Sequence, residues 1–495
     1  MPGLKQKIYQ LVIGRLDGQD IHSSTYRQRL LEEVHKGIGG FIVFGGKRTA
    51  VKELIEECQS AAAIPLFVAS DIERGAGQQI EGATVFPSQM AAAAGAPKDH
   101  PQGLRCIEQS LRAIADEAID IGINMPLIPV LDVNQNPDNP IICTRAFSDN
   151  AETVAWYGKK YIHILESTGL ISCAKHFPGH GDTAIDSHIA LPVIAKSLKD
   201  LMKTDILPFR DAIQAGVSSI MLGHLSIPAL DAVPTSLYSN VVTGLLRNEL
   251  EYEGIVMTDA LTMHALNEFD DVPVRCMQAG VDVILHPANA DSVVQDIHKA
   301  VTGGELAEQQ VDRAFQRVIS CKEKLKTKKK TIPDYNAHSN IAEELFHASI
   351  TLVKAGATEF NENLMNADLL FTGDENRIDT AGIQEHVSRI HHIKNYDVGT
   401  SQPEVIIAVF TTVAAWQGSS GIGDEDRKRI EAVIARAGRS IVISFGSPYV
   451  LRYFPAADAL IAVYDSSVQA QRAAMKCLKG EIPFQGRLPV SLDLS

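Results

Sequence analysis

Residues 171–224 contain the pattern that decides the fold: ISCAKHF at 171–177, LKDLMKTDILPFRDAIQ at 198–214 and SSIMLGH at 218–224. The first and last runs are short and apolar, which is typical of buried strands, whereas the middle run has the apolar spacing of an amphipathic helix. A strand, a helix and a second strand in this order predict a βα unit of a parallel sheet.

The same unit recurs over the first 325 residues, where helical patterns such as 27–35 and 311–325 lie between or after the strand runs. We expect eight strands, at 11–15, 41–44, 65–71, 123–133, 171–177, 218–224, 254–260 and 281–285. Eight strands in roughly 300 residues predict a (β/α)8 TIM-like barrel. An open doubly wound sheet is the alternative, but it would need fewer strands and a Gly-rich turn after the first, and neither is evident.

The rest of the chain has the pattern of a second α/β domain. Residues 321–330, CKEKLKTKKK, are interpreted as a helix end that runs into a solvated hinge, because clustered like charges resist packing. Beyond them, strand runs at 367–371, 405–410, 441–445 and 460–464 alternate with helical patterns such as 427–437. We therefore predict a barrel domain over 1–327, a linker over 328–342 and a smaller α/β sandwich domain over 343–495.

Composition excludes several classes of protein. Hydrophobic residues make up 45% of the chain, which argues against disorder, and a net charge of -14 argues against binding to nucleic acid or an anionic membrane surface. No apolar run reaches the roughly 18 residues of a membrane span. The seven cysteines are odd in number and scattered, so neither a disulfide framework nor a zinc ribbon is expected, and we predict a cytoplasmic protein with reduced thiols.

Polar residues are concentrated in the loop KHFPGHGDTAIDSH at 175–188, which has three histidines, two aspartates and a lysine. An ordinary surface loop is one interpretation. A metal site is a second, with His176, His180, His188, Asp182 and Asp186 as possible ligands, although the first strand lacks the His-x-His of many barrel metallohydrolases. The third is an acid/base pair, because Asp186 and His188 are two residues apart in an extended loop and point to the same side.

A reactive carboxylate is the second requirement for such chemistry, and Asp259 follows the apolar strand run 255–257. Sequence spacing also allows Asp259 to be the N-cap of a helix that begins at Leu261. Other polar residues stand at the ends of the strand runs or in the loops after them, where a barrel carries its active site: Asp71, Arg145, Lys175, His176 and His224.

These residues resemble the family 3 glycoside hydrolases, in particular their β-N-acetylglucosaminidase (β-N-acetylhexosaminidase) branch. The loop at 175–188 is the most specific match. Further matches are PVLDVNQNPDNPIICTRAFSDN from residue 129, PTSLYSNVVTGLLRNELEYEGIVMTDAL from 234, AGVDVIL from 279, SFGSPYVL from 444 and GEIPFQGRLPVSL from 480. The β-glucosidases of the same family have a similar order of motifs but lack the Asp-x-His loop.

The resemblance implies a retaining exo-β-N-acetylglucosaminidase that acts on short glycosides such as muropeptide or chitin-derived fragments, with no metal and no cofactor. Asp259 would be the nucleophile, His188 the general acid and base, and Asp186 its partner. The implied sugar-binding residues are Asp71, Arg145, Lys175 and His176, to which the rim position of His224 adds a fifth.

Three points remain open in the sequence. A histidine acid/base places no negative charge beside an incoming phosphate, so a phosphorylase is an alternative to a hydrolase. A sugar-binding protein without catalytic activity is a second alternative, which the intact Asp186, His188 and Asp259 argue against. Gln79 stands where many relatives have an arginine, so the neighbouring subsite differs in charge. The sequence predicts no oligomeric state.

Overall fold

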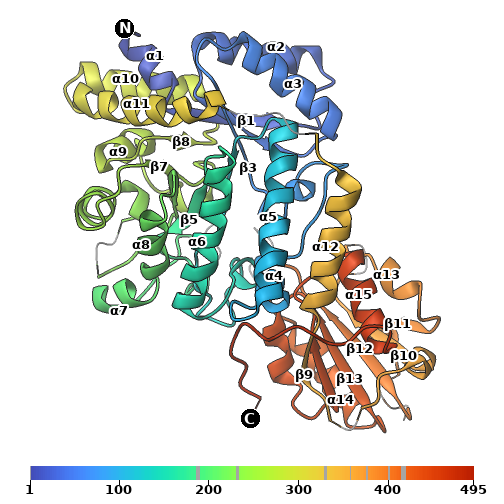
Figure 1. The fold of residues 1–495 in the computed structure, drawn as a ribbon. Coiled ribbons are helices and arrows are strands. Elements are labelled where there is room, and N and C mark those ends of the chain that lie inside the picture. The colour runs from blue at the N-terminus through green and yellow to red at the C-terminus, as the bar shows by residue number, and fades with distance from the viewer. Residues whose placement is uncertain are drawn as a thin grey trace. The chain divides into compact units, whose positions relative to one another are not determined.

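The structure is a computed structural model that describes residues 2–185, 190–229, 233–327, 332–356, 358–374, 377–397, 399, 402–413 and 420–494 (Figure 1). The chain forms two compact units. The first contains Met1–Val85, Glu108–Val133 and Val154–His338, and the second contains Phe86–Ile107, Asn134–Thr153 and Ser339–Ser495. Both units combine helices with largely parallel sheets, which confirms the predicted α/β class.

The first unit is a closed barrel of eight parallel strands. They are β1 Val12–Asp17, β2 Gly40–Phe44, β3 Phe67–Ser70, β4 Met125–Pro126, β5 Cys173–Phe177, β6 Ser219–Leu222, β7 Ile255–Thr258 and β8 Ile284–Leu285. Five strands pair in the order β4-β3-β2-β1-β8 and three in the order β5-β6-β7. Parallel bridges join the two groups, between Val130 and Lys175 and between Met257 and Val283, so the ring is complete.

Helices surround these strands (Figure 1). They are α1 Leu4–Tyr9, α2 Ser24–Lys36, α3 Arg48–Ala61, α5 Pro101–Ile121, α6 Ala151–Ser167, α7 Leu198–Lys203, α8 Leu207–Gln214, α9 Val272–Ala279, α10 Ala290–Thr302 and α11 Glu308–Glu323. The predicted helix 198–214 is two helices, because Pro208 lies in the first turn of α8 and cannot continue the hydrogen bonding of a preceding helix. Among the helices of the described chain, none is both long and apolar enough to cross a membrane.

The prediction of a solvated hinge was wrong at Lys322, which is buried in the barrel unit. Its Nζ donates hydrogen bonds to Gln10 Oε1 at 2.8 Å and to the carbonyl oxygen of Gly39 at 2.7 Å. The ammonium group also lies 4.8 Å from the centre of the Phe67 ring. Burial lowers the pKa of Lys322 to about 7. A side-chain amide oxygen, a backbone carbonyl oxygen and an aromatic face thus accommodate one lysine of a charged cluster inside the protein.

The second unit is a six-stranded sheet with the order β11-β10-β12-β13-β14-β9, in which only β9 is antiparallel to its neighbour. Its elements are α4 Gln89–Gly95, β9 Thr351–Lys354, β10 Asp368–Thr372, α13 Ala381–Gln384, β11 Ile390–His392, β12 Val405–Phe410, α14 Asp424–Ile434, β13 Ser440–Phe445, β14 Ala459–Ala462 and α15 Val468–Leu478. Alternate residues of β12 belong to two separate cores, with Ile407 in one and Ile406 in the other. Apolar side chains therefore cover both faces, as in other parallel sheets.

Helix α12, Tyr335–Ser349, begins within the predicted linker and is attached to the barrel unit at its first turn. The hydroxyl of Tyr335 donates to Asp120 Oδ2 at 3.0 Å, and His338 Nδ1 lies 3.0 Å from Glu117 Oε1. The guanidinium of Arg48 stacks 3.8 Å from the centre of the Tyr335 ring. Residues 335–338 are therefore packed structure rather than free chain.

Candidate active site

Side-chain alternation along β5 and β7 decides which residues point into the barrel. Cys173 and Met257 lie on strands that are not neighbours, yet their sulfur atoms are 3.7 Å apart, so both face the barrel axis. Residues two positions further along a strand point to the same side. Lys175 and Asp259 therefore lie in the next layer toward the carboxyl rim, where barrel enzymes carry their chemistry.

Lys175 joins two carboxylates at this rim. Its Nζ is 2.6 Å from Asp71 Oδ1 and 2.8 Å from Glu73 Oε1. The side chains of Lys175 and Glu73 are 2% and 6% exposed, whereas that of Asp71 is 32% exposed. Lys175 thus compensates a buried carboxylate and holds a second one that solvent or a ligand can reach. Sequence reasoning missed Glu73, although it is a charged residue two positions after a predicted site residue.

A buried carboxylate fixes the neighbouring histidine. Asp132 Oδ2 lies 2.7 Å from His176 Nδ1, and Asp132 Oδ1 accepts a hydrogen bond from the amide of His180 at 2.6 Å. Burial raises the pKa of Asp132, but the charges and hydrogen bonds of His176 and His180 together outweigh it, so the pKa is lowered overall. Sequence reasoning missed Asp132. It could have been found as an ionisable residue inside the apolar run 123–133.

Asp71, Lys175 and Asp259 surround the same part of the barrel. The thiol of Cys173 lies one layer below them, and burial raises its pKa to about 12. The charge of Lys175 opposes this rise, and the charges of Asp71 and Asp259 add to it.

The structure does not support the helix-cap interpretation of Asp259. The carboxylate accepts a hydrogen bond from the amide of the next residue, Ala260, at 2.7 Å, rather than from the second or third residue of a helix. The residues after it form a turn and a short 3-10 helix, His264–Leu266, whose cap is Met263. Helix α9 begins only at Val272.

The other predicted sugar-binding residues are placed as follows. His224 follows β6, is buried, and has its Nδ1 2.8 Å from Ser236 Oγ. Arg145 belongs to the second unit, where it ends a 3-10 helix, Cys143–Arg145, and donates from Nη1 to the carbonyl oxygen of Ile141 at 3.1 Å.

Asp186 and His188 lie outside the described residues, so the predicted acid/base pair stays a prediction. The loop is fixed on both sides of them. Lys196 Nζ lies 3.2 Å from Asp182 Oδ2 and 2.8 Å from Asp205 Oδ2. On the C-terminal side of the loop, Val193 forms a parallel bridge with Ser226, which comes shortly after β6.

Within the described ranges, no group of three or more His, Cys, Asp or Glu side chains is arranged to hold a metal ion. Two of the histidines considered as ligands direct Nδ1 at other protein groups. His176 uses it for Asp132, and His180 has Nδ1 2.8 Å from Thr183 Oγ1.

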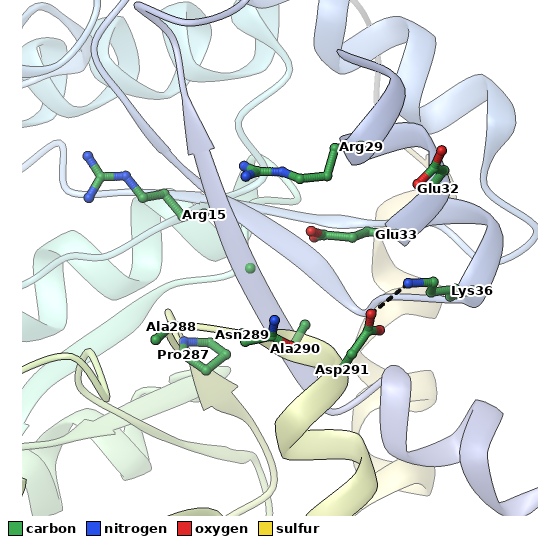
Figure 2. Close-up of a pocket in the computed structure, with 11 residues that line it drawn as sticks. Arg15, Arg29, Glu32, Glu33, Lys36, Pro287, Ala288, Asn289, Ala290 and Asp291 are labelled. Carbon is green, nitrogen blue, oxygen red and sulfur yellow. Dashed lines mark hydrogen bonds and ion pairs between the residues drawn. The ribbon is translucent and has the colours of Figure 1, made fainter. Parts of the chain in front are cut away.

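A separate cavity of about 300 Å³ lies between β1, α2 and the start of α10 (Figure 2). Its charged lining residues include Arg29, Glu33, Lys36 and Asp291, of which Lys36 and Asp291 form an ion pair at 2.7 Å. No predicted site residue in the described chain lines this cavity.

A closed (β/α)8 barrel with carboxylates, a lysine and a histidine at its carboxyl rim is the arrangement in which barrel enzymes carry their active sites. The family model "Glycosyl hydrolase family 3 N terminal domain" matches residues 3–321. The chain therefore belongs to glycosyl hydrolase family 3, which confirms the resemblance, and it acts on a carbohydrate substrate.

Relatives extend the similarity over both units. The chain is 29% identical to beta-hexosaminidase A of Pseudoalteromonas piscicida, covering 92% of this chain and 89% of the relative. It is 27% identical to a beta-N-acetylglucosaminidase/beta-glucosidase of Cellulomonas fimi, covering 92% and 88%. A solved family 3 beta-N-acetylglucosaminidase from Paenibacillus sp. str. FPU-7 is 28% identical, with a TM-score of 0.85 over 100% of both chains.

Proposed function

We propose that the protein is a retaining exo-β-N-acetylglucosaminidase that removes terminal β-linked N-acetylglucosamine from short glycosides. The observation that carries the proposal is the contact of Cys173 with Met257 inside the barrel, because Lys175 and Asp259 each come two residues later and strand alternation puts them on the same side. Membership of family 3 and the names of the relatives support the aminosugar specificity.

In the proposed mechanism an Asp259 carboxylate oxygen attacks the anomeric carbon while the bond from that carbon to the leaving oxygen breaks. His188 gives its proton to the leaving oxygen, and Asp186 stabilises the charged imidazole. Water then attacks the same carbon, His188 takes a proton from it, and the Asp259 carboxylate is released.

The neighbouring residues would bind the sugar. Asp71 has one carboxylate oxygen on Lys175 and is partly exposed, so it can accept hydrogen bonds from sugar hydroxyls. His176 is oriented by Asp132, whose Oδ2 lies 2.7 Å from His176 Nδ1. We include Arg145 and His224 in the sugar-binding set on the resemblance and on their positions in the sequence.

We further propose a cytoplasmic enzyme that processes fragments of cell-wall or chitin origin. All seven cysteines are free thiols, which fits a reducing compartment.

The test is release of p-nitrophenol from its β-N-acetylglucosaminide, with and without inorganic phosphate and with a chelator. We expect N-acetylglucosamine as the product under all three conditions. A sugar 1-phosphate formed with phosphate would identify a phosphorylase, and loss of activity with the chelator would identify a metal enzyme. Absence of turnover would reject the enzymatic proposal.

A further inference from the structure

His286 lies at the carboxyl rim beside the proposed nucleophile. It directly follows β8, whose last residue, Leu285, donates a hydrogen bond from its amide to Thr258 Oγ1 at the end of β7, at 3.0 Å. On the other side, the amide of His286 donates to the carbonyl oxygen of Ile13 in β1 at 2.8 Å. The backbone of His286 is thus held between β7, which leads to Asp259, and β1.

The side chains around His286 face the barrel mouth. Gly14 of β1 faces helix α2, so the side chain of its neighbour Arg15 leaves the opposite face of the strand; it is 49% exposed, and its Nη2 lies 2.8 Å from Asp17 Oδ2. Figure 2 shows Arg15 extending away from Arg29 across β1. The Arg15 guanidinium lies 4.9 Å from the centre of the Phe44 ring, and the His286 ring centre lies 5.6 Å from the same ring.

The charges that act on the His286 ring are those of Arg15, Asp259 and Asp71. Burial and the charge of Arg15 lower the pKa of His286, and the two carboxylates compensate this only in part. A neutral imidazole has one nitrogen that donates a hydrogen bond and one that accepts, which matches a hydroxyl group.

The backbone of His286 adds an independent observation. Its φ is 46°, in the left-handed region that residues other than glycine adopt infrequently and that occurs often at active sites. The motif AGVDVIL stops at Leu285, so the family resemblance assigns no role to His286.

We infer that His286 contacts the substrate and binds one ring hydroxyl of the sugar held between Asp71 and Asp259. This inference rests on the proposed function. The sugar would then have a polar contact at the rim above β8 and β1, in addition to the two carboxylates above β3 and β7.

The test compares p-nitrophenyl β-N-acetylglucosaminide with its 3-, 4- and 6-deoxy analogues in wild type, His286→Gly and His286→Asn. Glycine and asparagine both tolerate a left-handed backbone, and asparagine keeps a donor and an acceptor. His35→Ala, an exposed histidine on α2, is the matched control.

We expect His286→Gly to lower kcat/KM for the parent glycoside roughly tenfold and to leave kcat/KM for one deoxy analogue unchanged. His286→Asn should lower kcat/KM for the parent glycoside by a smaller factor, and His35→Ala should leave it unchanged. Equal losses on the parent and all three analogues, or no loss, would overturn the inference while the proposed function stands. If wild type does not cleave the parent glycoside, the proposed function itself fails. Should His286→Gly not fold, the same comparison with His286→Asn decides.

Discussion

Removal of the Lys175 charge tests how the rim is held together. In Lys175→Met, Glu73 would keep a carboxylate that is 6% exposed and has lost an ion pair of 2.8 Å, whereas Asp71 is 32% exposed and can be hydrated. Breaking a buried pair by removing one partner costs about 3–5 kcal/mol. We expect the free energy of unfolding to fall by about that amount, and most of the loss to come from Glu73.

The assay is urea unfolding of wild type, Lys175→Met, the double variant Lys175→Met/Glu73→Gln, and Lys322→Met as the control. The double variant should be more stable than Lys175→Met by roughly 1–3 kcal/mol, because glutamine removes the buried negative charge that has lost its ion pair with Lys175. Lys322 has uncharged partners, so Lys322→Met should lose no more than about 2 kcal/mol. Equal losses for the two lysine variants, or a further loss on adding Glu73→Gln, would refute this reasoning.

Three further predictions concern single residues. Asp259→Asn should keep the circular dichroism spectrum and lose activity by a factor on the order of 10⁴ or more, and a fluoro-sugar adduct on a peptide lacking Asp259 would contradict its assignment as the nucleophile. His188→Ala should lower kcat roughly 10²–10⁴-fold on a disaccharide and less at the glycosylation step of a nitrophenyl glycoside, so equal losses would remove it from the acid role. Burial lowers the pKa of Lys322 from 10.5 to about 7, so between these pH values the unfolded chain binds more protons than the folded protein. The free energy of unfolding of wild type relative to that of Lys322→Met should therefore rise as the pH rises over this range. A difference in urea midpoints that does not change with pH would exclude the shift.

The barrel was predictable because its strands are buried on both faces and therefore form continuous apolar runs. Each predicted run overlaps a strand, from β1 to β8. In the second unit the central strands β10, β12, β13 and β14 were predicted for the same reason. The edge strands β9 and β11 were missed, because they are short and partly exposed and contain no such run. The burial of Lys322 could not be predicted from the sequence, because the atoms that accept its hydrogen bonds belong to residues 10 and 39, far away in the chain.

The site was predictable where a polar residue lies at the end of a strand or directly after it. This rule selected Asp71, Lys175 and Asp259, which the structure brings to one layer of the barrel. It did not select Glu73 or Asp132, because their roles depend on partners more than forty positions away in the chain. Sequence reasoning can mark such residues as unusual but cannot supply their partners. The roles of Asp186 and His188 stay predictions.

The division of the chain into units has a consequence for anyone who edits the gene. Residues 86–107 and 134–153 are encoded among the barrel strands but belong to the second unit. Met90 and Cys143 pack in one core with residues such as Val405. An open reading frame stopped after codon 327 would leave these side chains without their partners, and codons 343–495 alone would lack part of their own interior. Swapping the second unit between homologues therefore requires exchanging three separate stretches of coding sequence together.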